Sequence, residues 1–478
     1  MKILFALFSV LIIMSGKVFA QTENPDSVIV REMSERRIPG LQVAVVKDGK
    51  IVFSKCYGTA NLEYNVPVTA QTLFDINSCT KAFTGVAIMQ LAAAEKIDLS
   101  SPVSRYLDSL PAAWQKVTIR QLLTHVSGIP DIAHVLDAAP GGLEGLGGEQ
   151  VAWKKTMALP MDFPTGERYR YNQTNYALLG KIIDKVSGEP FVSYFEHGQF
   201  RPAGMTSTGF GGSRDVIPGM AQTYTYVWSL DGEQLPQQTL INSYADFPLF
   251  RRTASGMIST ATDVANWLIS LQNGKLLHQR SLDTLWTPGR FNNGSPTLWA
   301  LGWVTRARDA HPAILASGGG RSAFIVYPHD GLSIVILTNL AGAFPERFFD
   351  EVAECYLPDV LSADPFSALH VKTWQMGFSQ AEKAWADLKM RYPNFDVPAA
   401  DLNDWGYRLA SAGRSEDALQ IFKLNVKAHP DDWNAYDSYG EVLLKNGHKA
   451  EAIKMYQRSV QLNPANENGK KVLQQITQ

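Results

Sequence analysis

Cysteine and histidine are both scarce in this chain. The sequence holds 3 cysteines, Cys56, Cys79 and Cys355, which are too few for a disulfide framework. The 9 histidines include no His-Glu-x-x-His motif and no Cys/His cluster with ligand spacing, so the sequence predicts no metal site and no bound cofactor. Cys79 directly follows Ser78, and adjacent side chains of a helix point in different directions. We therefore interpret Cys79 as a buried packing residue rather than a nucleophile.

The chain also lacks an excess of charge of either sign. It carries 44 basic and 46 acidic residues, for a net charge of −2. Proteins that bind nucleic acid or anionic membrane surfaces usually carry a basic patch, so neither kind of partner is expected here. The charge balance favours a small molecule or a peptide as the substrate.

Long apolar runs are confined to the N-terminus. The chain starts with Met-Lys, residues 3–14 are apolar, and residues 18–20 (VFA) have the small-residue pattern of a signal-peptide cleavage site. We expect residues 1–20 to be removed on export, so that the mature chain begins near Gln21 and is periplasmic or secreted. An uncleaved anchor is the alternative, but the run is shorter than the ~20 residues that a spanning helix needs. No later stretch is apolar enough to span a membrane.

The length and the 45% hydrophobic content predict a globular protein of two or three domains. Two Asp-Gly pairs, Asp48-Gly49 and Asp330-Gly331, each separate two alternating β-branched runs, which is a strong hairpin signal. These runs cover residues 41–58 and 324–338. The sequence thus predicts antiparallel strands at both ends of one large domain.

A serine and a lysine lie three residues apart in the stretch FDINSCTKAFTG, residues 74–85. The stretch joins a short strand-like run to a helix-like run that extends to about Ala94. Side chains at i and i+3 share one face of a helix, so we expect the Lys81 amine beside the Ser78 hydroxyl. This pair has the chemistry of a nucleophile with an adjacent base. The spacing alone is a weak indication, because chance supplies it roughly once or twice in a chain of this length.

Three further segments carry candidate residues. Tyr171 precedes a helix predicted over 175–186 and can carry a proton if a neighbouring cation lowers its pKa; a core aromatic is the alternative. The glycines at 318–320 lie at a strand edge, where they let the backbone approach a ligand or form a bulge. His125 precedes a turn composition, and we interpret it as a residue that ties this turn through hydrogen bonds.

Together these segments resemble the superfamily of serine β-lactamases and penicillin-binding proteins, in particular its class C-like branch with esterases and D-amino-acid peptidases. The resemblance covers residues 26–362 and rests on Ser-x-x-Lys, LLTHVSGIP, YNQTNYALLG, RPAGMTSTG, ASGMISTATDVANW and LGW, which occur in the family's order. It implies an α/β (α+β) β-lactamase-like fold, in which an antiparallel sheet built from both ends of the domain is flanked by helices. A mainly helical subdomain is inserted between the two ends.

The resemblance also implies roles for individual residues. Ser78 would attack a carbonyl and form an acyl-enzyme, while Lys81 and Tyr171 move the proton to the leaving group. Backbone N–H groups of Ser78 and Gly320 would hold the oxyanion. The residues expected at this oxyanion and substrate-binding edge are Gln173, Ser317, Gly318, Gly319 and Gly320.

Two positions depart from the family's pattern. The second motif is usually Tyr-x-Asn, but Gln173 stands in place of the Asn and offers the same amide one methylene further out. The third motif usually opens with Lys or His, but alignment on the glycines and Phe324 puts Ser317 there. A partner for a substrate carboxylate is therefore missing, unless Arg321 replaces it. Both departures weigh against an efficient β-lactamase or a strict D,D-peptidase.

The composition changes beyond Pro358 to Ala, Lys, Glu and Trp with helical spacing. Six residue pairs recur at an offset of 34 residues: Trp405/Tyr439, Gly406/Gly440, Gly413/Gly447, Ala418/Ala452, Phe422/Tyr456 and Pro430/Pro464. This period resembles that of tetratricopeptide repeats, which stack two antiparallel helices per unit. We predict such repeats over 401–478 after a helical linker over 363–400. The repeats would bind a protein partner or cover the catalytic domain, and an ordinary helical bundle is the alternative.

Three functions are compatible with the sequence. The leading prediction is an exported serine hydrolase that cleaves esters or amides through a Ser78 acyl-enzyme. The second is a β-lactamase or cell-wall D,D-peptidase, and the third is a non-catalytic ligand-binding protein with a docking module. No motif in the sequence encodes the identity of the substrate (an ester, a D-amino acid amide or a β-lactam) or the oligomeric state.

Overall fold

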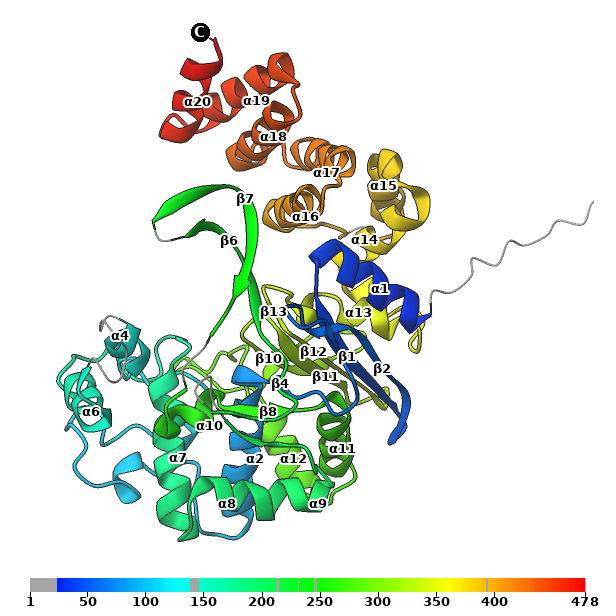
Figure 1. Cartoon of the computed structure of the whole chain (residues 1–478). Coiled ribbons are helices and arrows are strands. Elements are labelled where there is room, and N and C mark those ends of the chain that lie inside the picture. Colours follow the sequence, from blue (N-terminus) through cyan, green and yellow to red (C-terminus); the bar gives the residue numbers. More distant parts are fainter. Residues whose placement is uncertain are drawn as a thin grey trace, which may run out of the picture.

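The computed structural model describes residues 24–137, 146–211, 215–230, 232–244, 247–392 and 394–477. These residues form a large domain with a central sheet and a stack of helices at the C-terminal end (Figure 1). The predicted signal peptide lies outside the described residues. Within the described part of the chain, no helix is both long enough and apolar enough to cross a membrane.

A seven-stranded antiparallel sheet forms the centre of the large domain, in the order β3-β2-β1-β12-β11-β10-β9. Its strands are β1 Gly40–Lys47, β2 Lys50–Asn61, β3 Val66–Pro67, β9 Val304–Arg306, β10 Ala313–Gly318, β11 Ser322–Tyr327 and β12 Leu332–Thr338. Strand β1 pairs with β12, so the two predicted Asp-Gly hairpins meet in one sheet. In the first hairpin, Asp48 and Gly49 both have positive φ, 50° and 75°, as a tight two-residue turn requires.

Helices cover both faces of this sheet (Figure 1). Helices α1 (Pro25–Arg36) and α13 (Phe349–Ala353) pack on one face, and α2 (Thr80–Ala93) and α11 (Ala261–Gln272) pack on the other. Helix α2 is buried over almost its whole length, as its apolar residues predict. Its Phe83 stacks on Trp267 of α11 with ring centroids 3.7 Å apart. This packing fixes the position of the residues at the start of α2, including Ser78.

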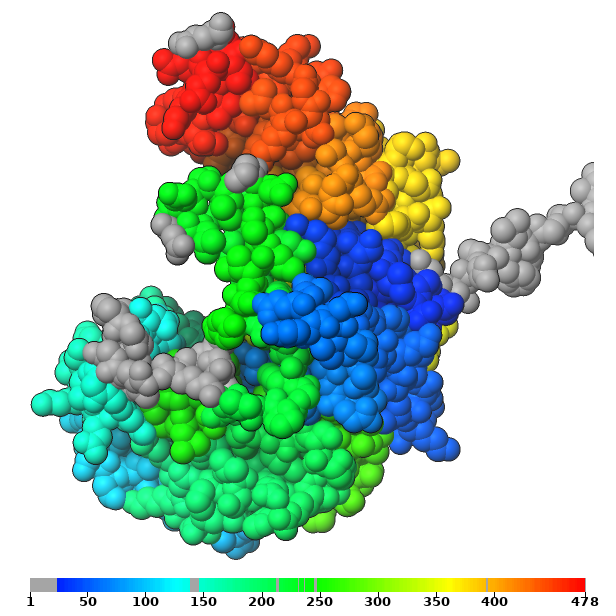
Figure 2. All heavy atoms as spheres, in the orientation of Figure 1, coloured from blue at the N-terminus to red at the C-terminus, as the bar shows by residue number. Residues whose placement is uncertain are grey.

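The remaining described elements of the large domain include further helices and two small sheets. The helices are α3 Ile119–Leu123, α4 Ile132–Asp137, α6 Glu149–Met157, α7 Gln173–Ser187, α8 Phe191–Phe195, α9 Arg201–Ala203, α10 Arg252–Ser255 and α12 Gln279–Trp286. One small sheet contains β4 Phe74–Asp75, β8 Met257–Ser259 and β5 Gly209–Phe210; the other contains β13 Leu340–Ala341, β6 Tyr224–Leu230 and β7 Glu233–Asn242. Figure 2 shows that the molecular surface is hollowed beneath the β6–β7 hairpin.

In the part of the chain that the structure describes, seven α-helices follow the large domain. They are α14 Pro365–Met376, α15 Ala381–Arg391, α16 Ala399–Ser411, α17 Ser415–Ala428, α18 Trp433–Lys445, α19 Lys449–Leu462 and α20 Glu467–Thr477. The pairs α16–α17 and α18–α19 begin and end 34 residues apart, which is the spacing of the sequence repeat. Helices α14 and α15 of the predicted linker share one hydrophobic core with α16 and α17. The tetratricopeptide identity of the repeat stays a prediction.

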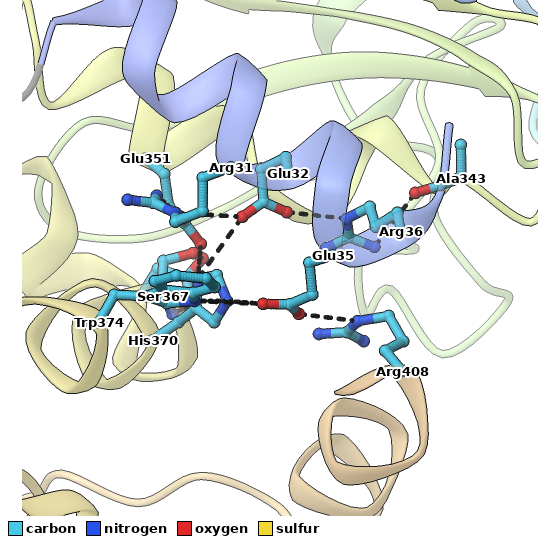
Figure 3. A network of polar contacts seen from close by, with 11 residues as sticks. Arg31, Glu32, Glu35, Arg36, Ala343, Glu351, Ser367, His370, Trp374 and Arg408 are labelled. Atoms are coloured by element: carbon cyan, nitrogen blue, oxygen red, sulfur yellow. Dashed lines mark hydrogen bonds and ion pairs between the residues drawn. The ribbon is translucent and has the colours of Figure 1, made fainter. Parts of the chain in front are cut away.

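A buried ionic network joins α14 and α16 to the large domain (Figure 3). The ring nitrogens of His370 lie 2.9 Å from a carboxylate oxygen of Glu351 and 3.0 Å from one of Glu35. Burial alone would lower the pKa of His370, but the charges of Glu351, Glu35 and Glu32 overcome it and raise the pKa to about 10. The imidazole is therefore charged at neutral pH and bonds carboxylates on both sides.

The same network contains groups spaced closely enough to hold a metal ion, namely Glu32, Glu351 and His370. Arginine side chains, however, already neutralise the carboxylates: Arg31 pairs with Glu351 and Arg36 pairs with Glu32. Both nitrogens of His370 also bond carboxylates, so neither has a free lone pair for a metal. We therefore interpret the cluster as an ionic network and not as a metal centre.

Candidate active site

Ser78 lies in a 3₁₀ turn, Asn77–Cys79, that leads directly into α2. The turn is held by the hydroxyl of Thr80, which donates to the Asn77 carbonyl (2.6 Å) and accepts from the Met257 N–H (3.2 Å). Ser78 itself is only partly buried, whereas its neighbours Asn77 and Cys79 are buried. The serine hydroxyl is therefore presented to solvent at the N-terminal end of a rigid, buried helix, where backbone N–H groups favour a developing negative charge.

The Lys81 amine lies 3.4 Å from Ser78 Oγ, as the three-residue spacing predicts. The side chain is fully buried, and burial, followed by the charge of Arg251, lowers the pKa of the amine well below its ordinary value. The amine also donates to Gln173 Oε1 (3.0 Å) and to the Ala254 carbonyl (2.8 Å). In its neutral form the amine has two N–H groups, and these two bonds would use both of them. In that form its lone pair would be available for the proton of Ser78.

The Tyr171 hydroxyl donates to Ser78 Oγ at 2.7 Å, on the second side of the nucleophile. The structure thus brings Ser78, Lys81 and Tyr171 together. The expected lowering of the Tyr171 pKa by a neighbouring cation is wrong, however: burial raises the pKa of this phenol. Tyr171 is a neutral hydrogen-bond donor at rest.

Gln173 and Asn172 have different roles. The Gln173 side chain accepts a hydrogen bond from Lys81, and the Asn172 side chain caps helix α7. Helix α7 begins at Gln173, two residues before the predicted start, because the Asn172 side chain caps it by accepting from the Asn175 N–H. Asn172 is buried, whereas the Gln173 side chain reaches Lys81. The backbone N–H of Gln173 donates to Asp131 Oδ1 at 3.1 Å, which fixes the start of the helix. The Gln in place of the family's Asn therefore keeps an amide oxygen on the Lys81 amine.

The three glycines form the turn between β10 and β11. A Cβ atom at Gly318 would lie 2.2 Å from the Ile76 carbonyl oxygen and 2.7 Å from the Ser78 nitrogen, so only glycine fits there. Gly320, by contrast, faces Phe344, and its carbonyl accepts from the Gly342 and Phe344 N–H groups (3.1 and 2.9 Å). The structure thus places Gly318, and not Gly320, against the backbone of the nucleophile.

Ser317 and Arg321 do not face Ser78. Along β10, Leu315 belongs to the core on the α1 side and Ala316 to the core on the α2 side, so Ser317 shares the face of Leu315 by alternation. The Arg321 side chain is buried and lies 3.7 Å from an Asp75 carboxylate oxygen. It therefore presents no exposed cation to a substrate carboxylate.

Cys79 is fully buried, and its thiol donates to the Ser322 carbonyl at 3.3 Å. This confirms the interpretation of Cys79 as a packing residue. Burial raises the pKa of the thiol, which makes it a poor nucleophile. None of the three cysteines is in a disulfide bond.

Two contributors to the site have no signal in the sequence. The Ala254 carbonyl acts through the backbone, which any residue could supply. His125, expected to tie the turn that follows it, instead contacts the segment around Tyr171: its ring lies 4.6 Å from the Tyr171 ring, between centroids. Neither contact is apparent without the fold, because the partners in each are far apart in the sequence: Lys81 and Ala254 in the first, His125 and Tyr171 in the second.

Comparison with known proteins supports this reading of the fold. The family model described as Beta-lactamase matches residues 26–354, more than half of the chain. The chain therefore belongs to the β-lactamase family. Protein flp of Staphylococcus aureus (strain COL) is 27% identical over 338 residues, which are 68% of this chain and 65% of that protein. The chain thus spans just under two thirds of the length of this curated relative.

Solved structures show the same fold. The octameric penicillin-binding protein homologue from Pyrococcus abyssi superposes with a TM-score of 0.59 and 23% identity, over 73% of this chain and 81% of that chain. EstCE1, a hydrolase with promiscuous acyltransferase activity, superposes with a TM-score of 0.56 and 21% identity, over 69% and 97%. The predicted β-lactamase-like fold, followed by a helical C-terminal region, is confirmed.

Proposed function

We propose that this protein is a serine hydrolase that cleaves esters or amides through an acyl-enzyme on Ser78. The observation that carries the proposal is the position of Ser78 Oγ, which accepts from the Tyr171 hydroxyl at 2.7 Å and lies 3.4 Å from the Lys81 amine. A serine hydroxyl is a weak nucleophile unless a base removes its proton. Lys81 is a suitable base because burial lowers the pKa of its amine, which favours the neutral form, and because the amine lies beside the serine hydroxyl.

In the proposed reaction, Ser78 Oγ attacks the substrate carbonyl carbon while its proton passes to the Lys81 amine. The tetrahedral intermediate then collapses, the bond to the leaving oxygen or nitrogen breaks, and Tyr171 delivers a proton to the leaving group. Tyr171 regains a proton from the Lys81 ammonium. Water attacks the acyl-enzyme with the same groups in reverse, which releases a carboxylic acid and restores the serine.

The oxyanion would be held by backbone N–H groups of Ser78 and of the β10–β11 turn. We propose Gly319 as the second donor in place of Gly320. Two contacts support this choice: Gly318 lies against the Ser78 nitrogen, and a Cβ at Gly319 would lie 3.0 Å from the Asn77 side chain. Removing one such donor typically raises the barrier by about 3–4 kcal/mol.

Hydrolysis of a chromogenic short-chain ester, together with labelling by a fluorophosphonate, tests the proposal. Ser78→Ala should abolish both, whereas Ser100→Ala, at an exposed serine, should change neither. Tyr171→Phe should reduce kcat by about 10²–10⁴, the usual range for loss of a proton carrier. Wild-type activity in Ser78→Ala would refute the proposed mechanism.

A β-lactamase or D,D-peptidase is the second candidate, and the family match favours it. The orientation of Ser317 and the burial of Arg321 weigh against it, because substrates of both enzymes carry a carboxylate. Turnover of nitrocefin and covalent capture of a fluorescent penicillin separate the candidates. We expect both to be much slower than ester hydrolysis.

We further propose that the C-terminal helices are a fixed cover of the catalytic domain. The buried network of His370, Glu35 and Glu351 supports a permanent attachment. Separating the helices from the domain would break the hydrogen bonds between these charged side chains. Binding of a protein partner by these helices, and export with loss of residues 1–20, remain proposals. Pull-down with the full chain and N-terminal sequencing of the exported protein test them.

A further inference from the structure

His125 holds the chain on both sides of Tyr171. Its backbone carbonyl accepts from the Arg170 N–H at 3.0 Å, and its ring Nδ1 accepts from the Asn172 N–H at 3.2 Å. Arg170 and Asn172 are the immediate neighbours of Tyr171 in the sequence. One residue therefore fixes the peptide groups before and after the tyrosine.

The conformation of His125 is specialised for these two bonds. Its φ is +58°, in the left-handed region that few residues other than Gly, Asn, Asp and His adopt. The side chain is fully buried, and its ring lies 4.6 Å from the Tyr171 ring and 4.9 Å from the Trp299 ring, between centroids. Packing thus holds the imidazole against the face of the tyrosine ring.

The hydrogen bonds also define the form of the imidazole. Because Nδ1 accepts from a backbone N–H, it carries no proton, and the neutral ring is protonated on Nε2. Within the described part of the chain, Nε2 has no hydrogen-bond partner and is surrounded by aromatic rings. Burial, followed by the charge of Lys81, lowers the pKa of His125 and keeps the ring neutral.

We propose that His125 is a positioning residue that holds the Tyr171 hydroxyl against Ser78. This inference rests on the proposed function of Tyr171 as the proton carrier. The 2.7 Å contact between Tyr171 and Ser78 depends on where the backbone places the tyrosine, and the backbone there is anchored by His125. A displacement of about 1 Å at a reacting group commonly costs about 10²-fold in rate.

Two substitutions test whether residue 125 needs both the side-chain acceptor and the tolerance of positive φ. In His125→Asn, the Oδ1 atom occupies the place of Nδ1 along the side chain, and Asn also tolerates positive φ. His125→Leu fills space but has no acceptor. We expect the Leu variant to lose about 10²-fold in kcat with little change in KM, and the Asn variant to recover at least a tenfold part of that loss. Equal activity of the Leu variant and the wild type, or equal losses in both variants, would overturn the proposal.

Direct observation of the imidazole keeps the proposal testable if the Leu variant does not fold. In the full-length wild type labelled with ¹⁵N-histidine, nitrogen chemical shifts should show His125 neutral and protonated on Nε2 at pH 7. A proton on Nδ1 would overturn the proposal. Tyr171→Phe separates a failure of the proposed function from a failure of the role proposed for His125. Wild-type activity in that variant refutes the proposed function itself. An inactive Tyr171→Phe beside a fully active His125→Leu refutes only the role of His125.

Discussion

Replacing His370 by leucine tests how firmly the C-terminal helices are attached to the catalytic domain. The imidazole bonds Glu351 at 2.9 Å and Glu35 at 3.0 Å, and all three side chains are almost completely buried. Leucine has a similar volume but donates to neither carboxylate. Removing one partner of a buried ionic contact typically costs about 3–5 kcal/mol, because the other charge stays buried without its partner. We expect a loss of that size in the free energy of unfolding.

A matched control lies on the same helix. Lys372 pairs with Asp387 at 3.0 Å, but their side chains are 30% and 33% exposed, so Lys372→Leu should cost at most about 1 kcal/mol. Both variants are compared with the wild type by calorimetry and by the rate of limited proteolysis in the C-terminal helices at pH 7. Equal and small effects of the two substitutions would show that the network does not stabilise the junction, and would refute the reasoning.

Three further predictions concern His370 and two residues beside Ser78, Lys81 and Gly318. The pKa of His370 in the folded protein, about 10, lies above its ordinary value of 6.5, so the stabilisation is complete below about pH 6.5 and is lost as the pH rises through 10. The melting temperature of the wild type should therefore fall more steeply over this range than that of His370→Leu; parallel profiles would contradict this. Because protonation removes the lone pair of Lys81, whose pKa is lowered, kcat/KM should fall as the pH is lowered through the pKa of this amine, and Lys81→Met should lose about 10²–10⁴-fold. Gly318→Ala should lower kcat by about 10²–10³, because the added methyl group would collide with the backbone at Ser78. Gly209→Ala is the control, because Gly209 has open space around it, and it should not lower kcat. Equal activities of the two variants would rule out the close approach of Gly318 to Ser78.

Local sequence signals were sufficient where one segment determines its own structure. The Asp-Gly pairs predict the two hairpins because the glycine of each pair, and in the first hairpin also Asp48, adopts the positive φ that the turn requires. The three-residue spacing of Ser78 and Lys81 predicts their contact because both lie on one helical stretch. The family resemblance added Tyr171, which is distant in the sequence but close to Ser78 in the fold.

The sequence could not supply properties that depend on how distant segments pack. Burial sets the pKa of Tyr171, and the prediction from a neighbouring cation therefore had the wrong sign. The register of the glycines depends on the docking of β10 beside α2, which places Gly318 against the Ser78 nitrogen. Alignment likewise left Arg321 as an open substitute for the missing cation, and only the fold shows it turned toward Asp75.

Identification of the acylated residue tests the central claim most directly. The full-length protein is treated with a fluorophosphonate or a slowly hydrolysed ester, digested, and analysed by mass spectrometry, with Ser78→Ala as the control. The arrangement of Ser78 between Lys81 and Tyr171 predicts one adduct per chain, on the peptide that contains Ser78, and none in the folded Ser78→Ala variant. An adduct on another residue, or ester turnover by Ser78→Ala at the wild-type rate, would contradict the account.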